Sequence, residues 1–503
     1  MEKRTRAATA GSLAAMAAFG ASELTAGLLG SVPSLVESIG DVIVDTVPTP
    51  IKDWAIAVFG VYDKLALIIG IIAVGLLVGA VVGLLAAGKR WVGPFVFVVF
   101  GVAGVVAAVS QGESLLGSVV GAAVAVAVGV VVLDFLLERA ERPSPEMDES
   151  RRRFLVTAGA TVVVVALAAG TGRMLIGRSR RLAARRGAVD LPSPVEAAPA
   201  PAPEMQMDVE GLSSLVTSNS DFYRIDTALS IPQVDIETWT LKITGMVDRP
   251  YEMDFEELLA MDMVERYVTL SCVSNRVGGD LVGNAKWLGV PLSAVLDRAG
   301  VIPGASQVVG RAVDGFTVGF PTQAVYDGRE ALVAVGMNGE PLPAEHGFPA
   351  RLVVAGLYGY VSATKWLAEI ELTTWDDFDA YWVPRGWSKV GPVKTQSRID
   401  TPRSGEQIGT EPRAIAGVAW APNVGIERVE VQIDDQAWVE AELAESLADD
   451  SWRQWKLDWA PTAGQHRIRV RATDKSGYTQ TDQMAPPAPD GATGWHTIRV
   501  TVT

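Results

Sequence analysis

Four long apolar runs in the first third of this chain constrain its fold more than any other feature. They cover residues 65–87, 91–109, 115–137 and 154–170. Each is close to the roughly 20 residues that a helix needs to cross the hydrocarbon core of a bilayer. An Ala/Gly-rich stretch at 7–29, interrupted by Glu23, is interpreted as a further span, a surface helix or a helix buried among the others, and we favour the span. The sequence therefore predicts a helical transmembrane region of about five spans over residues 1–175.

The charges that flank these runs predict an orientation. Five spans with the N-terminus inside put a set of ten basic residues on the cytoplasmic side, as the positive-inside rule expects: Lys3, Arg4, Arg6, Lys89, Arg90, Arg139, Arg142, Arg151, Arg152 and Arg153. This topology puts everything after residue 175 outside, where five arginines over 178–186 lie on the unfavoured side. The motif Ser-Arg-Arg-Arg-Phe-Leu at 150–155 resembles a twin-arginine export signal placed internally, which would carry a folded domain across. The alternative is a plain cytoplasmic arginine anchor.

The rest of the chain divides into three segments that differ in composition and in the periodicity of their apolar residues. Residues 176–209 are Arg-rich and then Pro/Ala-rich, which is typical of a stiff, extended linker. Residues 210–400 alternate β-rich runs, such as Thr238–Ile243 and Arg351–Val354, with helical pieces, such as Phe255–Met261 and Leu292–Ala299, and predict an α+β domain. Residues 401–503 hold short strands separated by turns and predict an immunoglobulin-like β-sandwich. Its expected strands are 414–420, 426–433, 452–459, 466–472 and 496–502.

Composition excludes several kinds of chemistry. Residues 191–503 carry 25 Lys and Arg against 43 Asp and Glu, a net charge of −18 that disfavours a nucleic-acid partner. The chain has one Cys and three His, which excludes a disulfide framework, a zinc ribbon and a Cys-ligated iron–sulfur cluster within it. Residues 1–345 contain no His, and Cys-x-x-Cys-His is absent. The spans therefore cannot hold a bis-His haem, and the sequence provides no c-type haem site.

Cys272 is the one thiol. It ends the β-rich run Tyr267–Ser271 and is followed by a loop with Arg276 four residues on. A nearby guanidinium lowers the pKa of a thiol and favours the thiolate, which acts as a nucleophile or as a soft metal ligand. The alternatives are a small buried hydrophobe, or a cysteine hydrolase with His346 as its partner.

Several ordered motifs resemble a known family. The segment from Arg266 reads RYVTLSCVSNRVGGDLVGNAKWLGVPL, with Cys, then Asn-Arg, then Trp-x-Gly-x-Pro-Leu. It looks like the molybdenum-ligand region of the sulfite oxidase family of molybdopterin enzymes. Further matches are Asn338–Pro343 running into His346–Arg351, and Gly356–Trp366. Motifs from Gly417 to Asp474 are similar to that family's immunoglobulin-like dimerisation domain, so the resemblance covers about residues 210–503.

The resemblance implies a role for seven residues. Cys272 would be the molybdenum ligand, and contacts to the pterin and its phosphate would come from His346, Arg351 and Lys365. A phosphate is suited to a guanidinium fork and an ammonium point charge. Arg224 matches the arginine that reaches the substrate oxyanion, and Arg276 matches the first arginine of the family's Asn-Arg-Arg run. Tyr381 matches the active-site tyrosine, with a spacing that differs by one residue.

Two departures from the family pattern concern the anion pocket. The second arginine of Asn-Arg-Arg is Val277 here, and the arginine that the dimerisation domain lends to the sulfite pocket has no counterpart over 486–493. Because each charge-assisted contact to an anion contributes about 1.5–3 kcal/mol, we expect a much reduced affinity for sulfite.

The expected protein is a membrane-anchored molybdenum–molybdopterin oxidoreductase of a bacterial cytoplasmic membrane, with its catalytic domain on the extracytoplasmic side. It would transfer an oxo group to or from a small-molecule substrate. Electrons would pass to or from a separate cytochrome or quinone-linked carrier, and a homodimer would form through the C-terminal domain. One alternative is a reductase of S-oxides or N-oxides at the same site. Another is a non-catalytic surface module whose sandwich binds a partner protein.

Overall fold

The computed structural model describes residues 3–29, 34–48, 51, 54–55, 58–59, 63–110, 115–141, 156, 159, 170–171, 186–187, 189–228 and 231–503. The chain forms two compact units, one of residues 1–183 with 227–231 and one of residues 184–226 with 232–503. The motif at 150–155 lies outside the described residues, as does the expected span over 154–170 apart from isolated positions.

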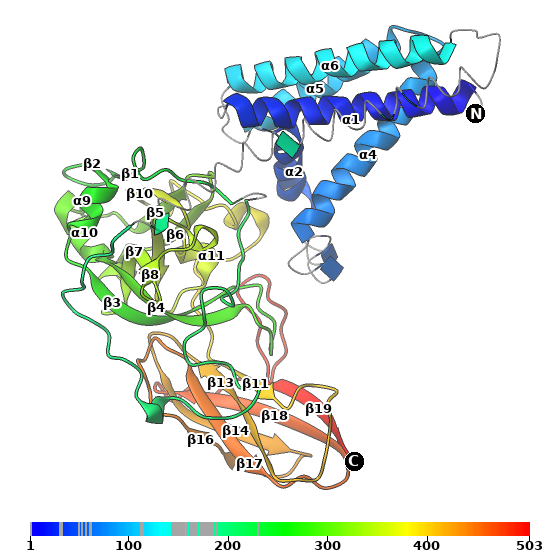
Figure 1. Ribbon diagram of the computed structural model, residues 1–503. Helices are drawn as coiled ribbons and strands as arrows, with labels where there is room; N and C mark the ends of the chain where they lie inside the picture. Colours follow the sequence, from blue (N-terminus) through cyan, green and yellow to red (C-terminus); the bar gives the residue numbers. More distant parts are fainter. Residues whose placement is uncertain are drawn as a thin grey trace. The chain divides into compact units, whose positions relative to one another are not determined.

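The first unit is helical (Figure 1). Its long helices are α1 (Lys3–Leu29), α2 (Leu35–Thr46), α4 (Asp63–Ala86), α5 (Val92–Ser110) and α6 (Leu115–Glu141). Within the described residues, three helical stretches are long and apolar enough to cross a membrane, and they are Leu65–Ala86, Val92–Val109 and Leu115–Ala140. They coincide with three of the four apolar runs of the sequence.

Helix α1 packs among the other helices through small residues. A Cβ on Gly11 would lie 1.9 Å from the carbonyl oxygen of Gly79, and one on Gly83 would lie 2.1 Å from that of Ala7, so α1 and α4 touch backbone to backbone. Such small-residue contacts are typical of helix pairs in membranes. Helix α1 is not among the three apolar stretches found in the described part of the chain. Its small residues are buried against the other helices, and the span that we favour for 7–29 stays a prediction.

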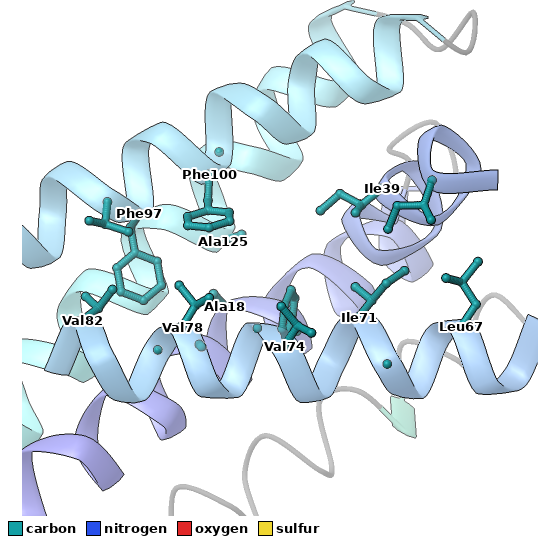
Figure 2. Close-up of a pocket in the computed structure, with 18 of the residues that line it drawn as sticks. Ala18, Ile39, Leu67, Ile71, Val74, Val78, Val82, Phe97, Phe100 and Ala125 are labelled. Atoms are coloured by element: carbon teal, nitrogen blue, oxygen red, sulfur yellow. The ribbon is translucent and has the colours of Figure 1, made fainter. Parts of the chain in front are cut away.

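A cavity of about 580 Å³ lies between the helices of this unit (Figure 2). Its lining comes from α1, α2, α4, α5 and α6 and from residues 55 and 59, and all of these residues are apolar or glycine. Val74, Val78 and Phe97 are among the side chains that point into it. None of the described residues that line this cavity is titratable, so its lining supplies no acid–base group.

The second unit begins with two sheets. One has the order β2-β1-β10-β5-β6, and the other has the order β3-β4-β7-β8 with β9 paired to β7 (Figure 1). The strands of the first are β1 (Thr240–Gly245), β2 (Tyr251–Asp254), β5 (Gln307–Ala312), β6 (Thr317–Pro321) and β10 (Leu367–Thr373). Those of the second are β3 (Val264–Ser271), β4 (Val282–Pro291), β7 (Ala331–Met337), β8 (Glu340–Pro341) and β9 (Arg351–Val354).

Short helices close this core as the sequence pattern predicts. Helix α9 (Phe255–Leu259) starts with a capping box, in which the Asp254 side chain accepts from the Glu257 backbone and the Glu257 side chain accepts from the Asp254 backbone. Helix α10 (Leu292–Ala299) buries its apolar face against strands of the second sheet, and α11 (Gly359–Ser362) is a single turn. The bounds of α10 and β9 are those that the sequence predicted.

The C-terminal part consists of two further sheets packed on one core. The first, in the order β11-β13-β17-β16, contains β11 (Gln396–Thr401), β13 (Arg413–Trp420), β16 (Glu442–Leu443) and β17 (Arg453–Trp459). The second, in the order β12-β19-β18-β14-β15, contains β12 (Gln407–Ile408), β14 (Ile426–Ile433), β15 (Val439–Glu440), β18 (Gly464–Asp474) and β19 (His496–Val502). Trp455 of one sheet and Val431 and Val470 of the other share the buried core. The expected boundary at residue 400 falls inside β11.

The Pro/Ala-rich segment is extended, as predicted, but it is not a free spacer. Val195 donates its backbone N–H to Met263 over 2.8 Å, and the Glu196 carboxylate lies 2.8 Å from the Arg266 guanidinium. Further along, the Met207 N–H donates to the Gln454 side chain over 2.7 Å. An extended proline-rich backbone makes no internal hydrogen bonds, so its N–H and C=O groups are free to bond to other segments. Here they bond next to and within β3 and to the C-terminal part.

Candidate active site

The sole cysteine lies where β3 ends. Cys272 directly follows the buried end of β3, and its backbone N–H donates to the Leu281 carbonyl over 2.9 Å. The Asn275 N–H donates back to the Cys272 carbonyl over 3.0 Å, while the Asn275 side-chain oxygen accepts from Leu281. These bonds form a tight loop over 272–281 that fixes the thiol at the edge of the second sheet.

The C-terminal part holds this loop in place. Arg398 of β11 donates to the Gly279 carbonyl over 2.9 Å. Gly278 has φ +77° and lies against the His496 ring so closely that a Cβ would come within 2.2 Å of it. The ring is itself fixed, because its Nδ1 accepts from the Ile399 N–H over 3.0 Å. The position of the cysteine loop therefore depends on both parts of the second unit.

The surroundings of the thiol differ from the sequence argument. Burial raises the pKa of Cys272, whereas hydrogen bonds from Ser274 and the charge of Lys365 act in the opposite direction. The Arg276 side chain, which the sequence argument placed beside the thiol, is exposed. The cation that opposes the effect of burial on the Cys272 pKa is Lys365 and not Arg276, and because burial dominates, the expected lowering of this pKa was wrong. A buried thiol of this kind gives up its proton when it binds a metal cation.

Two tyrosines share the neighbourhood of Cys272. Burial, with the charge of a Cys272 thiolate second, raises the pKa of Tyr223 well above its usual range. Burial also raises the pKa of Tyr358 to about 12, with smaller contributions from Asp490 and Cys272. A Cβ on Gly359 would lie 4.0 Å from the Tyr223 hydroxyl. Both phenols are therefore neutral proton donors at physiological pH.

His346 is buried and neutral. Its side chain is 2% exposed, and burial lowers its pKa to about 4. Nε2 lies 2.9 Å from the Asn219 carbonyl oxygen, which only an N–H can satisfy, so Nε2 carries the proton. Nδ1 is then an acceptor, and it has no hydrogen-bond partner among the residues that the structure describes. A ligand that offers a donor at this point would satisfy it.

Two buried cations lie close to His346. The Arg351 guanidinium donates to the His346 carbonyl over 3.1 Å and lies 4.9 Å from the centre of the Trp287 ring. The Lys365 ammonium donates to the Glu345 carbonyl over 3.0 Å. Burial lowers the pKa of Arg351 to about 10 and that of Lys365 to about 8. Such concentrated, poorly solvated positive charge favours an anionic ligand.

Arg224 is joined to these cations by a carboxylate. Its Nε lies 2.8 Å from Asp226, whose side chain is 5% exposed and also lies 3.3 Å from the Lys365 ammonium. The preceding Phe222 packs edge-on against both Trp287 and His346, with ring centres 5.8 and 5.5 Å apart. This aromatic packing brings Arg224, two residues further along the chain, to the site around Trp287 and His346.

The structure brings most of the predicted site residues together. Cys272, His346, Arg351, Lys365 and Arg224 form one connected cluster with Tyr223, Tyr358 and Asp226. Tyr381 packs on Phe316 and Trp382, with the Arg385 guanidinium 3.7 Å above its ring. The sequence argument missed Tyr223, Tyr358 and Asp226. Tyr358 stands inside the quoted segment Gly356–Trp366 and Tyr223 directly precedes Arg224, but no local pattern shows that either residue lies near the thiol.

Comparisons with known proteins agree with this geometry. Residues 228–382 match the family model of the oxidoreductase molybdopterin binding domain. The human mitochondrial sulfite oxidase is 27% identical over 320 residues, which cover 54% of this chain and 58% of the relative. The uncharacterized oxidoreductase YuiH of Bacillus subtilis is 34% identical over 157 residues, which cover 31% of this chain and 76% of the relative. The chain thus spans less than two thirds of the length of the mammalian sulfite oxidases that it matches.

A solved structure is also similar. The sulfane dehydrogenase SoxCD of Paracoccus pantotrophus has a TM-score of 0.48 at 23% identity, covering 56% of this chain and 80% of that chain. The matched region and the buried thiol define the class as a molybdopterin-binding oxidoreductase. Within that class, the chain belongs to the sulfite oxidase family.

The residues present suit the cofactor that this family implies. The acceptor Nδ1 of His346 is buried without a partner in the described part of the chain, and a pterin carries N–H donors. The buried ammonium of Lys365 and guanidinium of Arg351 suit a phosphate, and the thiol of Cys272 suits a soft metal ligand site. The donor set and the neutral acceptor therefore fit a molybdenum–molybdopterin group.

Proposed function

We propose that this protein is a membrane-anchored oxidoreductase that transfers an oxo group between molybdenum and a heteroatom of a small substrate. The observation that carries the proposal is the buried Cys272 thiol beside Lys365, Tyr223 and Tyr358, in a chain of the sulfite oxidase family. When bound, the cofactor supplies the oxo transfer, and the protein binds it, orients it and shapes the pocket.

Each residue of the cluster has a proposed role. Cys272 ligates the molybdenum, and the pterin and its phosphate are held by His346, Arg351 and Lys365. His346 accepts a hydrogen bond at Nδ1, because its Nε2 proton is already used on Asn219. The substrate side of the pocket is formed by Arg224, Arg276 and Tyr381. Tyr223 and Tyr358 exclude water from the thiol and offer neutral O–H donors.

The remaining regions have proposed roles in anchoring and assembly. We assign residues 1–175 to membrane spans, 176–209 to a linker, 210–400 to the catalytic domain and 401–503 to an immunoglobulin-like dimerisation domain. The three apolar helical stretches support the anchor. The two sheets around Trp455 support the sandwich. The basic residues at 3–6, 89–90, 139–142 and 151–153 support a catalytic domain on the extracytoplasmic side of a bacterial cytoplasmic membrane.

Electron balance requires a second protein or a quinone. Oxidation of sulfite to sulfate takes one oxygen atom from water and releases two electrons and two protons. Reduction of an S-oxide or N-oxide consumes two electrons and two protons and releases water. A separate cytochrome or quinone-linked carrier accepts or supplies these electrons.

Reduction of a neutral S-oxide or N-oxide has specific support. Val277 replaces a family arginine, and the segment at 486–493, which lacks the second one, carries Asp490 paired with Lys394 at 3.0 Å. The anion pocket is thus poorer by two cations. A neutral S-oxide or N-oxide needs a hydrogen-bond donor and no excess positive charge, so the depleted pocket suits it better than sulfite.

Two measurements on the purified full-length protein test the proposal. Elemental analysis after expression in a cofactor-competent host should find close to one molybdenum per chain, and its absence would favour the non-catalytic binding module. Kinetics with an artificial electron acceptor should then give a KM for sulfite above the usual range of about 1 μM–1 mM. Val277→Arg should lower that KM by about tenfold, if the new contact contributes about 1.4 kcal/mol.

The control adds the same charge elsewhere. Val439 lies on β15 in the C-terminal part and is 50% exposed, so Val439→Arg should leave the KM for sulfite within about twofold. Efficient oxidation of sulfite by the wild type, or a Val277→Arg variant that behaves as the control does, would contradict this account of the pocket.

A further inference from the structure

A buried carboxylate stands between two of the cations of the proposed site. One oxygen of Asp226 accepts from the Arg224 Nε at 2.8 Å and from the Lys365 ammonium at 3.3 Å. Its side chain is 5% exposed, and that of Lys365 is 10% exposed. Because solvent scarcely reaches this pair, its electrostatic effect is weakly screened.

The charges around the carboxylate explain its position. Arg224 and Arg351 both act on Lys365 with like charge, and Asp226 is the opposite charge that offsets them. Buried cations without a counter-ion are costly, so a carboxylate at this point stabilises the arrangement. Asp314 lies close enough to be influenced by both Asp226 and Lys365, and burial raises its pKa. The Asp226 carboxylate therefore balances part of the positive charge of Arg224, Arg351 and Lys365 before any substrate enters.

This balance affects anionic and neutral substrates differently. A sulfite or other dianion that approached Arg224 would meet the Asp226 carboxylate on the same guanidinium and be repelled by it. A neutral S-oxide would accept a hydrogen bond from the remaining N–H groups of Arg224 and carry no net charge to be repelled. An unfavourable contact aimed at one class of ligand is a recognised source of specificity.

We propose that Asp226 is a specificity residue, whose carboxylate on Arg224 repels anionic substrates and reserves the site for neutral S-oxides or N-oxides. This proposal rests on the proposed function and names its substrate class. It adds a repulsive element within the cluster to the loss of cations at Val277 and over 486–493.

Two redox-inert probes test the proposal by binding alone. Sulfate represents the dianion and dimethyl sulfone represents the neutral ligand, and isothermal titration calorimetry on the molybdenum-loaded full-length protein gives both Kd values. Asp226→Asn should lower the Kd for sulfate by about tenfold or more, which corresponds to about 1.4 kcal/mol. The ratio of the sulfate Kd to the dimethyl sulfone Kd should fall by a similar factor.

A matched control removes a charge from the same loop. Asp221 is exposed and accepts from Ser218 at 2.7 Å, so Asp221→Asn should change the sulfate Kd by less than about twofold. Molybdenum content is measured for each variant. If Asp226→Asn fails to load the metal, Asp226→Ser offers a second neutral side chain, with the same result expected.

Several outcomes would overturn the proposal. One is a wild-type Kd for sulfate below about 1 mM. Another is an Asp226 variant with full molybdenum content and an unchanged or weaker affinity for sulfate, which would mean that the carboxylate only positions Lys365. Failure of the proposed function gives a different result, because the loaded wild type would then turn over neither sulfite nor any S-oxide or N-oxide, whatever its affinity for sulfate.

Discussion

Gly278 gives the sharpest test of how the two parts of the second unit cooperate at the cysteine loop. It has φ +77°, and a Cβ added there would lie 2.2 Å from Cδ2 and 2.3 Å from Nε2 of the His496 ring. The ring cannot turn away freely, because its Nδ1 accepts from the Ile399 N–H over 3.0 Å. Gly278→Ala should therefore shift either the loop that carries Cys272 or the start of β19.

The cost of this substitution has two sources. Placing an L-residue in the left-handed region costs about 1–2 kcal/mol. Forcing a methyl group into packed surroundings costs about 1–3 kcal/mol more. Gly405→Ala isolates the first source, because Gly405 has φ +83° and a Cβ added there would meet nothing within 4 Å. The difference between the two variants, about 2 kcal/mol, measures the contact between the loop and His496.

Thermal unfolding followed by tryptophan fluorescence, together with molybdenum content, provides the assay. At roughly 2–4 °C per kcal/mol for a domain of this size, Gly278→Ala should melt roughly 4–8 °C below Gly405→Ala. It should also retain less molybdenum, because the displaced loop carries the proposed ligand. Equal melting temperatures and equal metal contents in the two variants would show that His496 does not hold the loop.

Three further predictions concern the ligand, the export signal and pH. Cys272→Ser should fold and be exported but be inactive, because a hydroxyl replaces the soft thiolate, and wild-type turnover by this variant would make the cysteine structural. Changing Arg151 and Arg152 together to Lys should leave the catalytic domain on the cytoplasmic face, which protease digestion of intact spheroplasts detects; unchanged external accessibility would reduce the motif to an anchor. Burial lowers the pKa of His346 from 6.5 to about 4, so the unfolded chain binds a proton between these values that the folded chain does not. The neutral, buried His346 therefore contributes to the free energy of unfolding above pH 6.5, and this contribution falls by about 3 kcal/mol as the pH is lowered to 4. The melting temperature of the wild type should fall between pH 7 and 5, and His346→Gln should make that fall smaller.

The local elements could be predicted from the sequence because local periodicity governs them. The bounds of α10, β9, β14 and β19 are those expected from apolar spacing and turns. Three of the apolar runs are helices long and apolar enough to cross a membrane. In α10 and the strands the apolar residues recur every 3.6 or every two residues, whereas the membrane-length helices are apolar on all sides. Both patterns are present in the sequence before the chain folds.

The surroundings of the site could be predicted only in part. The motifs identified Cys272, His346, Arg351, Lys365 and Arg224, and the structure places these residues in one cluster. Arg276 is expected beside the thiol because it is near in the chain, whereas the cation that influences the thiol is Lys365, from the segment before β10. A short separation in sequence does not predict which side chains contact each other when the loop that carries them exposes its side chains to solvent.

The sequence by itself determined the elements, the class of chemistry and most of the reactive groups of this protein. Only the tertiary structure decided that Asp226 bridges Arg224 and Lys365, that His496 of the C-terminal part supports the cysteine loop, and that the Pro/Ala-rich segment lies against β3. The physical reason is that these contacts join residues far apart in the chain. Their geometry depends on how whole sheets pack, whereas the apolar pattern that predicts a helix or a strand lies within a short stretch of sequence.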